Sequence, residues 1–144
     1  MTSGWRSVQS KKPSVAKLPE DTFFIDRSLG VEPVRSALAT SGLKVEIHDD
    51  HFSRDEDDRV WLTEIGQRGW VVLTKDQRLR YRPLEKEALK ASKARVFVLT
   101  AGNLRGIDIA TAFSTALPEI AKILGSHPGP FVARVSRLGT ITIS

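Results

Sequence analysis

Three aspartates in this chain stand where their carboxylates could meet. Asp26 directly follows the apolar run 22–25, Asp76 comes soon after the run 70–74, and Asp58 opens a helical stretch. If the two runs are neighbouring parallel strands, their carboxyl ends share one sheet edge, which is where α/β proteins bind ligands. Two carboxylates about 4 Å apart repel by roughly 4 kcal/mol at an effective dielectric of 20. A cation is therefore expected between them.

Oxygen ligands of this kind suit a hard divalent cation, Mg²⁺ or Mn²⁺. The chain contains no cysteine, which excludes thiolate metal sites and disulfides. A hard cation would activate water and bind a phosphoryl oxygen, and a second one would stabilise the leaving oxygen. The pattern therefore predicts metal-assisted attack of water on a phosphoryl group, with Asp26, Asp58 and Asp76 as metal ligands and catalytic residues.

Each of these aspartates also has an ordinary structural explanation. Asp58 stands at the start of a helix, where aspartate is a common N-cap. Asp26 and Asp76 could simply form turns. However, helical spacing places Asp58 on the same face as the apolar stripe that includes Trp61 and Ile65, so its carboxylate is expected to point toward the sheet.

The net charge of +5 is unevenly distributed along the chain. Residues 44–67 carry eight acidic and three basic side chains, whereas residues 68–105 carry three acidic and ten basic ones. An acidic pocket beside a basic surface suits a metal site next to a polyanion. A charged loop that only keeps the domain soluble is the other explanation. The residues predicted to hold the phosphates of such a polyanion are the cations of one segment: Lys75, Arg78, Arg80 and Arg82.

Short apolar runs alternate with helical stretches along the chain. The predicted strands are 22–25, 44–47, 70–74 and 95–99, and the predicted helices are about 33–41, 58–67, 84–91 and 107–124. This alternation predicts βαβ units and a parallel sheet. Two further alternating runs, 131–135 and 140–143, predict a C-terminal hairpin. Pro118 predicts a kink or a break in the last helix.

The length of 144 residues suits one folded domain. Residues 1–20 are polar, lysine-rich and aperiodic, which predicts a disordered tail or partner-docking arm before a domain at 21–144. No apolar stretch approaches the roughly 18 residues of a membrane span, and the first residues lack the apolar core of a signal peptide. The absence of cysteine is in keeping with a cytoplasmic protein.

Several segments resemble the PIN domains, the ribonuclease fold of VapC-type toxins, and in particular its small PIN-like branch in toxin–antitoxin loci. The matching segments are 23–30, 58–62, 69–76, 78–83 and 99–104, within a resemblance that extends over about residues 22–135. The resemblance implies a three-layer α/β/α fold with a mainly parallel sheet and an acidic pocket that holds Mg²⁺ or Mn²⁺. Asp26, Asp58 and Asp76 would match the first three acidic positions.

The fourth position of the family, an acidic or polar residue after the fourth strand, is matched less clearly. Asp108 is the candidate metal ligand there, although helical spacing places it nearly opposite the apolar stripe, and favourable interaction with the helix dipole explains it as well. Asn103 is a weaker candidate for polar support. Thr74 could orient a metal-bound water or simply complete its strand.

The residues and the resemblance together predict a metal-dependent endoribonuclease, the toxin of a type II toxin–antitoxin pair. The candidate partners are RNA, a cognate antitoxin protein and a second copy of the chain. The leading alternative is a PIN-like module that binds RNA or protein without cutting. A receiver-like signalling domain is a third reading, but Asp26 lacks the paired acid that such a domain carries after its first strand.

Overall fold

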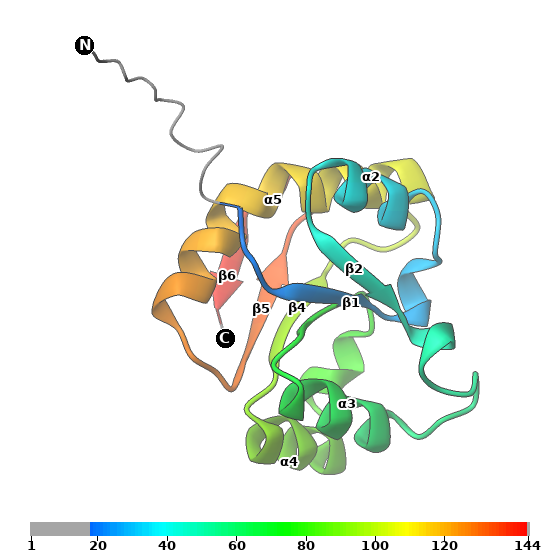
Figure 1. Ribbon diagram of the computed structural model, residues 1–144, viewed down its shortest axis with the longest axis vertical. Helices are drawn as coiled ribbons and strands as arrows, with labels where there is room; N and C mark the ends of the chain where they lie inside the picture. The colour runs from blue at the N-terminus through cyan, green and yellow to red at the C-terminus, as the bar shows by residue number, and fades with distance from the viewer. Residues whose placement is uncertain (1–17, 144) are drawn as a thin grey trace.

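The computed structural model describes residues 18–143, and its centre is a six-stranded sheet of order β2-β1-β3-β4-β5-β6 (Figure 1). The strands are β1 (Thr22–Ile25), β2 (Lys44–Ile47), β3 (Val71–Thr74), β4 (Arg95–Leu99), β5 (Phe131–Val135) and β6 (Ile141–Ile143). Strands β1 to β5 are parallel, and β6 returns antiparallel to β5. All the parallel strands therefore end at the same edge.

Two pairs of helices cover the two faces of this sheet (Figure 1). One face carries α2 (Val34–Thr40) and α5 (Gly106–Ser126), and the other carries α3 (Asp58–Gln67) and α4 (Pro83–Ser92). Three short 3-10 turns complete the described elements: η3 (Arg27–Leu29), η4 (His48–Asp50) and η5 (Gln77–Arg80). The three layers are the arrangement that a mainly parallel sheet requires, because crossover helices bury both of its faces.

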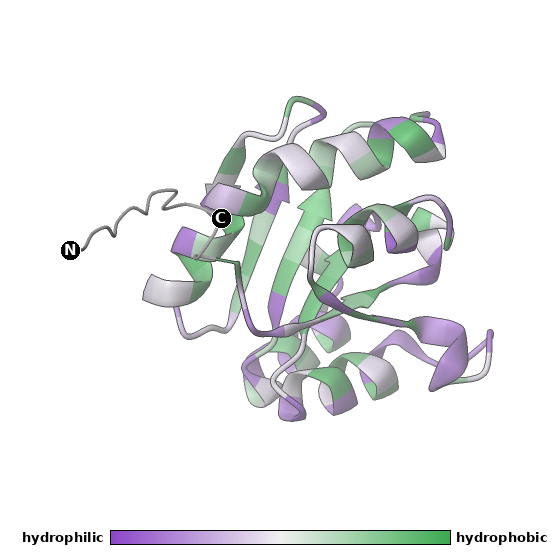
Figure 2. Cartoon of the chain, turned by 45° about the horizontal axis from the view of Figure 1, so that its top comes forward, coloured by the Kyte–Doolittle hydropathy of each residue, from purple (hydrophilic) through white to green (hydrophobic). Residues whose placement is uncertain are grey.

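The period-two alternation of the strands divides their apolar side chains between two cores. Phe23 and Ile25 face α2 and α5, whereas Phe24 between them packs on Trp61 of α3. The central strands are accordingly apolar on both sides and mainly green in Figure 2. Full burial of one such aromatic side chain contributes about 1.5–3 kcal/mol, so the two cores fix the sheet firmly beneath its edges.

Strand β5 is covered unequally on its two faces. Phe131, Ala133 and Val135 are buried against α5, and Val132 packs at the margin of the α3–α4 core. Arg134, the remaining side chain on the α3–α4 side, belongs to neither core. This leaves part of the sheet face near β5 and β6 outside the helical layer.

The predicted α/β fold, with its mainly parallel sheet and C-terminal hairpin, is confirmed. Of the kink or break predicted at Pro118, the break is wrong, because α5 continues through the proline; the kink stays a prediction. Buried side chains on both sides of it, such as Phe113 and Ile120, hold the helix on the sheet and offset the local cost of roughly 3 kcal/mol. Residues 1–17 of the predicted tail lie outside the described residues. No described helix is both long and apolar enough to cross a membrane.

Candidate active site

The carboxyl ends of β1 and β3 lie side by side, because these strands pair in parallel with Ile25 opposite Leu73. The amide of Asp26 extends this ladder by donating to the carbonyl of Leu73 at 3.0 Å. The chain then leaves β1 through η3 and β3 through η5. Asp26 and Asp76 are therefore presented from adjacent strand ends, as the sequence predicts.

Asp26 is held by two hydroxyl groups and is only 8% exposed. Its Oδ2 accepts from Ser28 Oγ at 2.7 Å and from Thr74 Oγ1 at 2.8 Å. Each hydroxyl in turn accepts from a backbone amide at 3.0 Å, Ser28 from Lys75 and Thr74 from Asp76, which leaves their protons for the carboxylate. Within the described residues no hydrogen bond reaches Oδ1, so that oxygen is available to a ligand.

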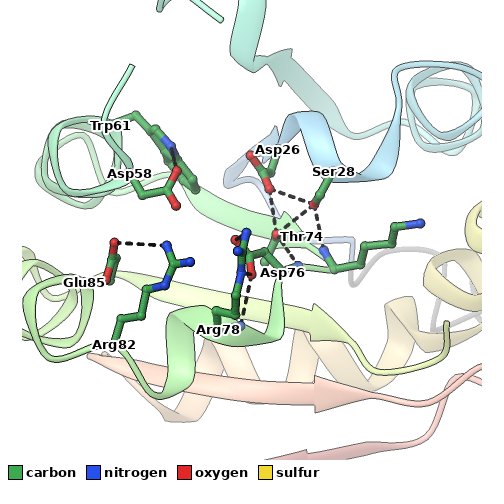
Figure 3. Close-up of polar contacts among 10 residues, drawn as sticks. Asp26, Ser28, Asp58, Trp61, Thr74, Asp76, Arg78, Arg82 and Glu85 are labelled. Atoms are coloured by element: carbon green, nitrogen blue, oxygen red, sulfur yellow. Dashed lines mark hydrogen bonds and ion pairs between the residues drawn. The ribbon is translucent and has the colours of Figure 1, made fainter. Parts of the chain in front are cut away.

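Asp58 lies in the first turn of α3 but does not cap it. The N-cap is Asp57, whose carboxylate accepts from the amide of Arg59 at 2.8 Å. Asp58 instead accepts from Trp61 Nε1 at 2.9 Å, one turn further along the inward face of the helix. The alternative that Asp58 is a helix cap is therefore wrong, and its carboxylate faces the sheet edge (Figure 3).

The surroundings of Asp58 disfavour its negative charge. Burial raises the pKa of Asp58, and the negative charges of Asp26, Asp76 and Glu85 raise it further. The hydrogen bond from Trp61 opposes these effects but does not outweigh them. Repulsion among like charges at this edge is therefore present in the folded protein, as the sequence argument requires.

Asp76 forms the start of η5 and is clamped by an arginine. Its Oδ1 accepts from both the amide and the Nε of Arg78 at 3.0 Å, and its Oδ2 accepts from Nη2 at 3.2 Å. Burial alone would raise the pKa of Asp76, but the hydrogen bonds from Arg78 and the charges of Arg78 and Arg82 outweigh it, so the pKa is lowered. Asp76 is thus a turn-forming residue and a member of the acidic group at once.

A fourth carboxylate, which the sequence analysis missed, comes from α4. Glu85 is 9% exposed and lies on the same helical face as Leu89 and Ser92. Its charge contributes to the raised pKa of Asp58, and Arg82 approaches it at 3.8 Å. The signal that singled out Asp58, an acid on an inward helical stripe, is present here at spacing i, i+4, i+7 and would have found it.

The four carboxylates face a common space, with two guanidinium groups beside them (Figure 3). Among the described side chains at this edge, negative charge therefore remains unbalanced. Among residues 18–143, however, no three acidic or histidine side chains are arranged as a finished coordination sphere. Hydrogen bonds turn Asp76 toward Arg78 and Asp58 toward Trp61. The all-oxygen donor set fits a hard cation in its chemistry, and these two side chains would have to turn to bind one.

Comparison with known proteins identifies the family. The family model for a PIN-like domain matches residues 22–101, more than half of the chain. The chain belongs to the PIN-like domain family. It is also 26% identical, over 119 residues, to a Mycobacterium tuberculosis protein named "Putative ribonuclease VapC45". The alignment covers 80% of this chain and 86% of that protein. No solved structure gives a significant match.

The basic residues of this PIN-like domain lie partly over its acids. Arg78 and Arg82 are 66% and 44% exposed and pair with Asp76 and Glu85. Lys75 donates its backbone amide to the Ser28 hydroxyl, and the side chain of Arg80 lies outside the described part of the structure. Arg78 and Arg82 thus partly neutralise the acidic group, and the role of the predicted cations toward RNA stays a prediction.

The remaining candidates of the sequence analysis lie in different surroundings. Asp108 is a 44% exposed side chain at the start of α5 that pairs with Arg105 at 3.3 Å, and it is not among the charges that shift the pKa of Asp58. Asn103 is exposed, with a left-handed φ of 58°. Thr74 is fully buried and supports Asp26. A metal-binding role for Asp108 stays a prediction, and Glu85 is nearer to the other acids.

Proposed function

We propose that this PIN-like domain is a metal-dependent endoribonuclease that hydrolyses RNA phosphodiesters. The observation that supports this most strongly is the group of four carboxylates at the carboxyl edge of the sheet. Burial, together with the negative charges of the other three, raises the pKa of Asp58, and among the described side chains two arginines offset the charge of the group. Ion pairs that only stabilise the fold need no excess of negative over positive side chains. A site that binds a divalent cation does need such an excess.

Asp26, Asp58 and Asp76 are the proposed ligands of Mg²⁺ or Mn²⁺, and Glu85 adds negative charge beside them. When bound, the cation supplies an activated water and positive charge for the phosphoryl oxygen. Ser28 and Thr74 keep Asp26 in one orientation, which limits the entropy lost on binding. Arg78 has to release Asp76, and the freed guanidinium is then available to an RNA phosphate.

The biological role that fits best is the toxin of a type II toxin–antitoxin pair, acting in the cytoplasm and inhibited by a cognate antitoxin. The named ribonuclease relative from Mycobacterium tuberculosis supports this proposal, because the match extends over most of both chains. Dimerisation is a further part of the proposal.

Cleavage of labelled RNA tests this function. Purified protein is incubated with a mixed RNA pool in Mg²⁺, in Mn²⁺ and in EDTA, beside the variants Asp76→Asn and Glu119→Gln. Glu119 is an exposed acid on α5, far in sequence from the site, and its variant serves as the charge-matched control. We expect cleavage by the wild type and Glu119→Gln with metal only, and a rate at least about 100-fold lower for Asp76→Asn.

Two outcomes would contradict the proposal. An undiminished cleavage rate in Asp76→Asn would show that the acidic group takes no part in RNA cleavage. RNA binding without cleavage by the wild type, in either metal, would favour the non-catalytic PIN-like module instead. The clamp of Arg78 on Asp76 gives that alternative a structural basis, because it holds one proposed ligand away from the others.

A further inference from the structure

A polar pocket of about 230 Å³ opens beside the acidic edge, on the sheet face that α3 and α4 leave uncovered. It lies between the start of η5 and the C-terminal strands. Its lining consists of one guanidinium and five neutral polar side chains: Arg134, Gln77, Thr100, Ser136, Thr140 and Thr142. No carboxylate lines it, so its only formal charge is positive.

Arg134 is the unusual member of this lining. Its Nε is buried, yet among the described residues it has no hydrogen-bond partner. A buried donor without an acceptor is costly, and for a cation the cost is larger. Arg78, Arg82 and Arg95 each have a carboxylate beside them, whereas Arg134 lines a pocket that has none. The missing component is an acceptor that carries negative charge.

The position of the pocket relates it to the proposed active site. In the sheet register, Thr74 of β3 lies opposite Val98 of β4, and Val98 lies opposite Arg134 of β5. Two strand spacings separate the backbones of Thr74 and Arg134 by about 10 Å. Gln77, which follows Asp76, reaches across with Nε2 to the carbonyl of Thr100 at 3.3 Å and forms the wall between acids and pocket.

From these observations we infer that this pocket binds a backbone phosphate of the RNA substrate, next to the phosphodiester held at the acidic group. A guanidinium matches the geometry of phosphate oxygens, and hydroxyl groups such as that of Thr142, opposite Arg134 on β6, supply additional donors. The pocket reads charge rather than base identity, so it positions the strand without selecting a sequence. This inference rests on the proposed ribonuclease function.

Binding in the absence of metal tests the pocket separately from catalysis. Fluorescence anisotropy in EDTA measures the Kd of three short single-stranded RNAs of unrelated sequence for the wild type and for Arg134→Gln, Arg134→Lys and Arg137→Gln. Arg137 is exposed in the same hairpin but does not line the pocket, so its variant is the matched loss of one charge. Melting temperatures establish that each variant is folded.

We expect Arg134→Gln to raise the Kd about tenfold for all three RNAs and to lower the slope of log Kd against log salt by about one. Arg134→Lys, which keeps the charge without the planar fork, should lie between, and Arg137→Gln should stay within about twofold. Equal Kd values for Arg134→Gln and Arg137→Gln would overturn the inference. So would saturable binding of inorganic phosphate at the pocket with unchanged RNA affinity, which would identify a free-phosphate site.

The two proposals fail in different ways. If the wild type binds RNA through Arg134 but does not cleave it with Mn²⁺, the ribonuclease function is wrong and the binding pocket stands. If the wild type cleaves RNA and Arg134→Gln leaves Kd, salt slope and KM unchanged, the pocket is wrong and the function stands. In the expected case, Arg134→Gln raises KM with little change in kcat, because the group is distant from the reacting atoms.

Discussion

The two ends of the same sheet differ in charge balance: acid and cation are paired at the amino end, and acids are in excess at the carboxyl end. At the amino end, just before β1 and at the start of β4, Arg95 donates to Asp21 at 2.8 Å and to the carbonyl of Gly69 at 2.7 Å. One acid meets one cation there, and both are half-buried or better. At the carboxyl end, the group of four carboxylates shares two arginines and retains negative charge.

We interpret the difference as a division between residues that hold the fold and residues that, under the proposed function, take part in the chemistry. A paired charge needs no further partner in the folded protein, whereas an excess of one sign costs stability unless a ligand of the opposite sign binds. Substitutions at the amino end should therefore change stability and spare activity. Substitutions at the carboxyl end should do the reverse, and each of the following measurements can sharpen or break that division.

The largest expected effect is on the cleavage rate of Asp26→Asn. Asparagine still accepts hydrogen bonds from Ser28 and Thr74, so the fold is retained while the charged ligand is lost. We expect the RNA cleavage rate in Mn²⁺ to fall at least about 100-fold. Asp21→Asn, just before the same strand, is the control and should stay within about twofold. Similar rates for the two variants would break the comparison.

Arg95→Met should have the largest effect on stability. The half-buried Asp21 loses its cation and Gly69 loses a donor, so the free energy of unfolding measured in urea should fall by about 1–2 kcal/mol. Arg35→Met removes an exposed ion pair with Glu32 and should leave the free energy of unfolding nearly unchanged. Mn²⁺ affinity should be unchanged in both; a loss of affinity in Arg95→Met would show that the two ends are coupled.

Glu85→Gln should weaken function by an intermediate amount. The variant removes negative charge beside Asp58 without altering the buried stem of the side chain, so we expect Mn²⁺ affinity and cleavage to fall about tenfold. Glu87→Gln, an exposed acid on the same helix, is the matched control. If both variants behave like the wild type, Glu85 is only the partner of Arg82.

The smallest expected effect is a change in thermal stability in Asp58→Asn, and the sign of that change is diagnostic. Because the pKa of Asp58 is raised in the folded protein, its contribution to stability decreases as pH rises from the ordinary aspartate range through the raised pKa. Asparagine keeps the acceptor for Trp61 and removes the repulsion, so Tm at neutral pH should rise by about 1–3 °C. The gain should disappear at acid pH, where wild-type Asp58 is protonated.

Asp57 provides the matched control, because its pKa is shifted in the opposite direction from that of Asp58. The side chain and amide of Arg59 lower its pKa to about 2, so its stabilising contribution is present at neutral pH and is lost as pH falls toward that value. Asp57→Asn should therefore leave Tm unchanged or lower it at neutral pH. The account holds that the negative charge destabilises the fold at Asp58 but not at Asp57. A rise in Tm for Asp57→Asn, or a fall for Asp58→Asn, would contradict it.

The sequence was sufficient to place Asp26, Asp58 and Asp76, because strand ends and helical faces follow from local periodicity. Glu85 carries the same helical signal as Asp58, an acid on the inward face of a helix, so its place was predictable from the sequence as well. The pairing of Arg78 with Asp76 depends on the 3-10 geometry of η5, which propensities do not specify. Whether the face of β5 that holds Arg134 is covered depends on how far α4 extends across the sheet. That is set by tertiary packing, which local sequence patterns do not specify.

Titration calorimetry with Mn²⁺ tests the central claim most directly, that the unbalanced carboxylates at the carboxyl edge form a cation site. The wild type should bind Mn²⁺ saturably, and Asp26→Asn and Asp76→Asn should lose that binding while Asp21→Asn keeps it. Absence of saturable binding by the wild type, or equal binding by all four proteins, would contradict the account.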